Sequence, residues 1–215
     1  MKTILTAFAL ALLMAPSMAS SQQLMFGPGW KEQRFSMFSS NDFGLNGESM
    51  SVRSDETVSL MWTALPEALW DSREASWDWS VARSVPPTDL TLKGGDDRNL
   101  SLYFVFLPRA AAEAARGRGV MSLLDNEDAR VLMYMWGGDH ARGDILPSPY
   151  LGERGRIVIS RGAGTGSAME SVDLAADHRR AFGSGPENLV GIAVSADSDD
   201  TRTEVVAEIA RLRFR

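Results

Sequence analysis

The stretch SWDWSVAR at residues 76–83 decides the fold class of this chain. Successive side chains of a β-strand point to opposite faces, so Trp77, Trp79 and Val81 share one face and the intervening residues share the other. A second stretch, LSLYFVFL at residues 100–107, is apolar on both faces, which is typical of a strand in the middle of a layered fold. Together the two stretches predict a sheet that packs against a second layer.

Short segments of strand character recur on both sides of these two stretches, separated by turn residues. They lie at residues 34–39, 49–53, 58–64, 131–136, 157–160, 189–196 and 204–214. The last segment is ambiguous, because Val205, Ile209 and Leu212 have a spacing that fits a helix almost as well as a bulged strand. We predict a strand there, because the preceding chain is rich in strands.

Two segments favour helices. Residues 109–130 begin with an alanine-rich run and are then broken by glycines, which predicts an inserted helical loop. Residues 173–182 begin with Asp173 as a candidate N-cap and are followed by Gly183. We therefore predict a mainly β fold, an antiparallel β-sandwich or jelly roll with one or two short helices. The glycine-rich stretch 161–167 lacks the lysine of a phosphate-binding loop and predicts a flexible hairpin or lid.

The first residues have the order of a secretory signal peptide. Lys2 supplies a positive charge, residues 4–14 are apolar apart from Thr6, and small residues precede a cleavage position after Ala19. The apolar run is shorter than the about 20 residues that a membrane-spanning helix needs. We therefore predict a signal peptide over residues 1–19, a mature protein that is periplasmic or secreted, and no membrane span.

Composition limits the classes of function. The formal net charge of −6 argues against a nucleic-acid partner. The chain has no cysteine, so it forms no disulfide and has no cysteine nucleophile. Its only histidines, His140 and His178, fit no histidine-rich metal motif and give little support to a catalytic triad.

Several segments, in this order and spacing, resemble the bacterial family known as domain of unknown function 3047. The segments are WDW at 77–79, GGDDRNLSLYFVF at 94–106, LMYMWG at 132–137, DLAADHRRAFGSGPENLVGIAV at 173–194 and DSDDT at 197–201. The resemblance implies a single galactose-binding-like β-sandwich domain over residues 20–215, a pattern shared with many carbohydrate-binding modules. It also implies a last strand that carries Glu208 before Ile209. Met169 stands where the family tends to have a tryptophan.

Two acidic groups are candidate sites. Asp96 and Asp97 precede a core strand, where they, with Arg98, either bind a ligand or form a turn in which aspartate caps its own backbone. Asp197, Asp199 and Asp200, followed by Thr201, bring three carboxylates into four residues. Calcium prefers such oxygen ligands, although the EF-hand spacing is absent. This turn is therefore either a calcium site or a solvated acidic turn.

Aromatic side chains offer a second kind of candidate, because flat rings stack on sugars. Trp77 and Trp79 share one strand face, where burial in the core is the more common environment and stacking on a ligand is the alternative. Trp136 ends a strand beside two glycines and is predicted to face a ligand. Tyr150 lies in the following loop and is predicted to assist it.

These observations predict an exported, non-catalytic β-sandwich protein that binds a carbohydrate or a cell-envelope glycan. One alternative is a polysaccharide-acting enzyme that pairs Asp96 or Asp97 with Asp197 or Glu208, because glycosidases use two carboxylates. Another alternative is a structural protein of the envelope without a small ligand, in which calcium only stiffens a turn.

Overall fold

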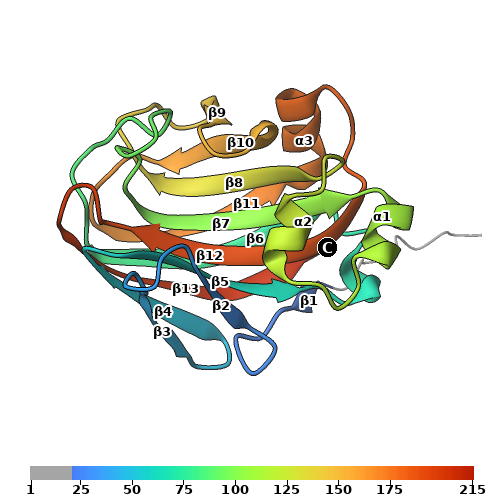
Figure 1. The fold of residues 1–215 in the computed structure, drawn as a ribbon, viewed down its shortest axis with the longest axis horizontal. Helices are drawn as coiled ribbons and strands as arrows, with labels where there is room; N and C mark the ends of the chain where they lie inside the picture. Colours follow the sequence, from blue (N-terminus) through green and yellow to red (C-terminus); the bar gives the residue numbers. More distant parts are fainter. Residues whose placement is uncertain (1–20) are drawn as a thin grey trace, which may run out of the picture.

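The computed structural model describes residues 21–215, which form two β-sheets packed face to face (Figure 1). The predicted signal peptide lies outside the described residues. One sheet has the strand order β11-β6-β13-β4-β3, and β1 pairs with the end of β13. Its strands are β1 (Gln22–Gln23), β3 (Asp42–Leu45), β4 (Ser49–Asp55), β6 (Glu74–Arg83), β11 (Gly166–Asp173) and β13 (Glu204–Phe214).

The other sheet has seven strands in the order β2-β5-β12-β7-β8-β10-β9. They are β2 (Lys31–Arg34), β5 (Val58–Ala64), β7 (Arg98–Leu107), β8 (Arg130–Gly137), β9 (Ile145–Ser148), β10 (Gly152–Arg161) and β12 (Asn188–Asp197). The described strand pairs are antiparallel, except that β10 runs parallel to β8 because the chain first forms β9 beyond it. The predicted class, a mainly β sandwich, is confirmed.

Aromatic side chains join the two sheets. The ring centroid of Trp77, on β6, lies 6.0 Å from that of Phe104 and 5.5 Å from that of Tyr134, which belong to the opposite sheet. Trp79 packs in the same way on Trp136, at 5.6 Å. The alternation in SWDWSVAR thus directs its apolar face into the core, as the sequence predicts.

The ambiguous segment 204–214 is strand β13, and a β-bulge explains its helix-like spacing. Val205 and Ile209 are buried at even intervals along the strand, but Leu212 is the next buried residue after Ile209. The pairing with β6 shifts register between Ala210 and Arg213, and Arg211 has a positive φ of 51°. The extra residue of a bulge turns a two-residue period into a three-residue step.

The helical predictions are confirmed. Helix α3 (Leu174–Phe182) begins after Asp173, whose Oδ1 accepts a 2.8 Å hydrogen bond from the Ala176 amide. It ends at Gly183, which has the left-handed φ of 78°. The inserted segment contains α1 (Arg109–Ala114) and α2 (Val120–Leu124), and a short 3₁₀ helix (Glu67–Leu69) precedes β6. No helix within residues 21–215 is long and apolar enough to cross a membrane.

Three local predictions are wrong. The strand expected at 34–39 ends at Arg34, and the chain then turns through a Ser36–Ser39 bridge. The stretch 161–167 is not a hairpin, because it crosses from β10 in one sheet to β11 in the other. Strands β9 and β11 were not predicted from the sequence. Both lie at sheet edges and carry proline or many polar residues, so they lack the apolar pattern of buried strands.

Candidate functional site

Two chain segments far apart in sequence meet where β7 begins and β12 ends. Asp197 on β12 is the ladder partner of Arg98 on β7. The turn after β12 folds over the start of β7, and the Thr201 amide donates a 2.7 Å hydrogen bond to Asp97. We call this region the acidic edge. It comprises Asp96, Asp97, Arg98, Tyr150, Asp197, Asp199, Asp200 and Thr201.

A buried arginine organises the acidic edge. The Arg98 Nη1 atom donates to Asp96 Oδ2 at 3.0 Å and to Asp197 Oδ2 at 2.9 Å. The remaining guanidinium nitrogens donate to Ser101 Oγ at 3.0 Å and to the Tyr103 hydroxyl at 3.2 Å. All three charged side chains are buried. One guanidinium therefore faces two carboxylates, and it compensates only one of them fully.

Asp197 is the carboxyl group whose negative charge Arg98 does not fully compensate. Its Oδ1 atom is buried and has no hydrogen-bond partner. Burial raises the pKa of the Asp197 carboxyl to about 8, and the carboxylates of Asp199 and Asp97 add to this rise against the lowering effect of Arg98. The protonated carboxyl is thus the favoured form near neutral pH.

This raised pKa predicts a specific pH dependence. In the unfolded chain the carboxyl loses its proton near pH 3.8, whereas in the folded protein it keeps it up to about pH 8. The folded state binds the extra proton between these values, so its contribution to stability is full below pH 3.8 and falls by up to about 1.4 kcal/mol per pH unit until pH 8. The test is urea unfolding in the presence of a chelator. As the pH rises from 4.5 to 8, the free energy of unfolding of wild type should fall relative to that of Asp197→Asn. Identical pH profiles would refute the raised pKa, and Asp128→Asn, which removes an exposed acid from another loop, is the control.

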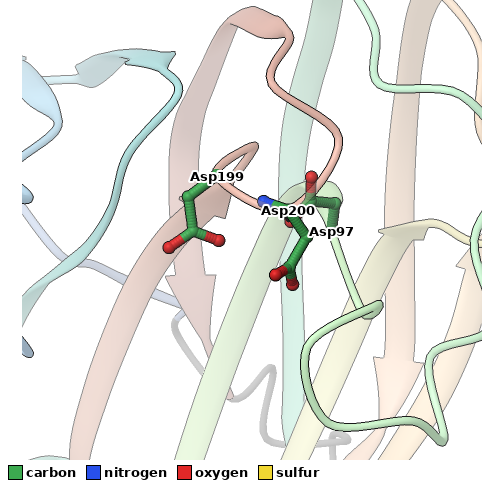
Figure 2. A group of neighbouring side chains, drawn as sticks. All are labelled: Asp97, Asp199 and Asp200. Atoms are coloured by element: carbon green, nitrogen blue, oxygen red, sulfur yellow. Dashed lines mark hydrogen bonds between the residues drawn. The ribbon is translucent and has the colours of Figure 1, made fainter.

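Three carboxylates at this edge are close enough to share one cation. Asp97, Asp199 and Asp200 each offer an oxygen, and these oxygens lie within 4.8 Å of one another (Figure 2). Asp97 is fully buried and also accepts from the Thr201 hydroxyl, whereas Asp199 and Asp200 are exposed. An all-oxygen set with two solvent-facing members fits calcium, which tolerates flexible geometry. Neighbouring Asp197 has a buried Oδ1 without a hydrogen-bond partner at this edge.

Tyr150 adds an exposed ring to the acidic edge. Its side chain is 58% exposed, while its hydroxyl donates a 2.8 Å hydrogen bond to Asp96 Oδ1. Burial and the bond to Asp96 raise the pKa of the Tyr150 hydroxyl to about 12. The Lys93 ammonium lies 5.6 Å from the ring centroid. The ring is thus held by its polar end and presents its body to solvent.

Two further exposed rings lie at this edge and were missed from the sequence. Phe35 and Phe38 are 53% and 94% exposed in the loop after β2. Ser39 fixes this loop to Val58 through bonds of 2.6 Å and 2.9 Å, and Val58 is the ladder partner of Asp197. The alternation of Phe35 and Met37 predicted a strand, so the loop received no functional role. The sequence signal that could have identified this loop is the pair of phenylalanines, Phe35 and Phe38, because they have no apolar partner in the strand pattern.

The tryptophans are not part of the acidic edge. Trp79 and Trp136 are 2% and 3% exposed, and they pack against each other in the core. This corrects the expectation that Trp136 faces a ligand. Trp136 follows Tyr134 by two residues on β8, so both rings point to the same, inner face.

The structure separates Glu208 from the other carboxylates that were proposed as a glycosidase pair. Glu208 lies on β13 in the six-stranded sheet, while Asp96 and Asp197 belong to the acidic edge of the other sheet. Asp96 and Asp197 share a single guanidinium nitrogen. An ion-pair network thus occupies the place where the sequence suggested a catalytic pair.

The fold and this site define a class of protein, a mainly β sandwich with a charged, aromatic strand-end surface. The family model described as "Protein of unknown function (DUF3047)" matches residues 28–213, and the chain belongs to this family. No curated protein matches the chain in sequence.

Solved structures of similar architecture have low sequence identity to this chain. A variant of the Cel12A cellulase of Rhodothermus marinus has 12% identity and a TM-score of 0.44, covering 91% of this chain and 99% of its own. The xyloglucanase domain of NopAA from Sinorhizobium fredii has 8% identity and a TM-score of 0.43, with coverages of 92% and 98%. The K1 cleaved adhesin domain of Lys-gingipain from Porphyromonas gingivalis W83 has 10% identity and a TM-score of 0.39, with coverages of 91% and 98%.

Proposed function

We propose that this protein is exported and binds a carbohydrate at the acidic edge without catalysing a reaction. One observation carries the proposal. Among residues 21–215, the three aromatic side chains that are largely exposed, Phe35, Phe38 and Tyr150, all lie at this edge, beside its carboxylates. The tryptophans are buried in the core, so within residues 21–215 the largely exposed aromatic side chains gather only at the acidic edge.

The chemistry of the edge matches that of a sugar. A sugar ring presents apolar C–H faces, which pack on aromatic rings, and hydroxyl groups, which donate to carboxylates. Tyr150 offers both kinds of contact, because its ring is exposed and its hydroxyl is bonded to Asp96. The excess of acids over bases disfavours a phosphate or another anionic ligand.

Export is supported by the charged, apolar and small-residue order of residues 1–19. It restricts the ligand to glycans of the cell envelope or the surroundings. N-terminal sequencing of the protein recovered outside the cytoplasm should begin at Ser20, and an intact Met1 would contradict export.

Calcium is proposed as part of the site, held by Asp97, Asp199 and Asp200. A ligand that binds only the folded state raises its stability by about 2.7 kcal/mol at one hundred times Kd, which for this length raises Tm by about 5 °C or more. Thermal melts in calcium and in chelator should differ by this amount. The Asp199→Asn/Asp200→Asn variant should lose the difference, and Asp139→Asn, an exposed acid elsewhere, should keep it. Equal melting temperatures for wild type would remove calcium from the site.

Glycan binding is tested on the exposed rings. A glycan array that covers bacterial-envelope and plant cell-wall saccharides should identify a ligand for wild type, and calorimetry then measures its affinity. We expect Tyr150→Ala and Phe38→Ala each to lower the affinity about tenfold, a loss of about 1.4 kcal/mol. Met121→Ala removes an exposed apolar side chain from α2 and serves as the control. Wild-type affinity in both ring variants would contradict the proposed site.

A further inference from the structure

A polar groove lies on the outer face of the six-stranded sheet, away from the acidic edge. It has a volume of about 390 Å³ and runs over strands β11, β6 and β13. Its lining includes Asp78, Ser80, Ser167, Glu208 and Arg211. The proposed site at the acidic edge uses none of these residues.

The strand ladders align the polar groups of the groove in one row. Ser167 pairs with Ser80 and Ser80 with Glu208, so hydroxyl and carboxylate groups cross the three strands of the groove, and Ser51 on β4 continues the row beyond it. Neighbouring strands are about 4.8 Å apart, close to the length of one sugar unit in an extended chain. Small side chains in this row keep the groove open.

Arg211 borders the groove through an unusual backbone conformation. Its φ of 51° lies in the left-handed region, which a non-glycine residue rarely adopts. It is the extra residue of the β13 bulge, and bulges re-aim side chains. Its guanidinium forms an ion pair with Asp78 from the neighbouring strand. The bulge thus places a fixed donor group against one wall of the groove.

Glu208 supplies the free charge of the groove. Its carboxylate is exposed and makes no hydrogen bond or ion pair with the residues that the structure describes. Because Arg211 already faces Asp78, the groove as a whole has an excess of acceptors. An anionic ligand is therefore disfavoured, whereas a neutral ligand rich in hydroxyl donors is matched.

We propose that this groove binds a linear, neutral oligosaccharide in an extended conformation across the strands. Ser80 and Ser167 accept from and donate to hydroxyls of successive sugar units, Glu208 accepts from them, and Arg211 donates at the groove wall. This second site lies on the opposite sheet from the acidic edge and does not depend on it.

The test uses amide chemical shifts of the mature protein with four hexasaccharides: β-1,4-glucan, β-1,4-xylan, β-1,3-glucan and β-1,4-mannan. At millimolar concentration at least one should shift the amides of Ser80, Ser167 and Glu208. Glu208→Ala should weaken this binding at least tenfold, and Asp128→Ala, which removes an exposed acid from another loop, should not change it. The Asp199→Asn variant should also bind normally, which separates a failure of this site from a failure of the acidic edge.

Arg211→Gly gives a second, independent readout. Glycine adopts a positive φ without strain, so this variant should melt no lower than wild type yet bind the hexasaccharide more weakly. A merely structural role for Arg211 would leave the affinity unchanged. The proposal is overturned if no hexasaccharide shifts the groove amides, if Glu208→Ala binds as wild type does, or if spermidine shifts them and the sugars do not.

Discussion

Replacement of Arg98 with methionine is expected to lower the free energy of unfolding by about 3–5 kcal/mol, the usual effect of removing one partner from a buried ion pair. The Arg98 side chain contacts both Asp96 and Asp197, the second of which lies 99 residues beyond it in the sequence, and Arg98 is 6% exposed. Methionine keeps much of the volume but leaves the buried Asp96 carboxylate without a cation and the buried Asp197 carboxyl without a donor. The loss of the five hydrogen bonds that the Arg98 side chain donates acts in the same direction.

Urea unfolding monitored by tryptophan fluorescence measures this effect. Arg118→Met, on the exposed loop after α1, is the control and should change stability by less than about 0.5 kcal/mol. Adding Asp96→Asn and Asp197→Asn to Arg98→Met should restore part of the loss, because no uncompensated buried carboxylate then remains at this position. A small loss for Arg98→Met alone, or no recovery in the triple variant, would contradict the ion-pair network.

Replacement of Trp77 with alanine should destabilise the fold by about 3–5 kcal/mol, the range for large aromatic residues in a core. The ring is 1% exposed and lies at the centre of an aromatic cluster with Trp79, Phe104 and Tyr134. The cluster joins the two sheets, so its loss leaves a cavity at the sheet interface.

Met169→Ala is the control for Trp77→Ala, because Met169 is 74% exposed on strand β11. Its stability should stay within about 0.5 kcal/mol of wild type. If Trp77→Ala were as mild as this control, Trp77 would not hold the two sheets together.

The fold class was predictable because burial leaves a periodic trace. Trp77, Trp79 and Val81 repeat every second residue, and the structure buries all three. Asp173 and Gly183 marked the ends of α3 because capping depends on neighbouring residues alone. The bulge at Arg211 was open to two interpretations, since an extra residue in a strand imitates helical spacing.

The acidic edge was predictable only in pieces. Asp96 and Asp197 were both singled out, but their contact through Arg98 depends on the pairing of β7 with β12, which no local pattern encodes. Trp136 was misplaced because a glycine-flanked strand end can point either way. Phe38 was overlooked because apolar residues are normally predicted to be buried in the core. Its 94% exposure depends on the tertiary structure of the loop.

Amide chemical-shift mapping of the protein in calcium, with the saccharide that the glycan array identifies, tests the carbohydrate site at the acidic edge. Such a site predicts shifts that gather at residues 35–39, 93–98, 150 and 197–201, and that Tyr150→Ala reduces them. Saturating saccharide that leaves all of these amides unmoved, in protein that remains folded, would contradict a carbohydrate site at the acidic edge.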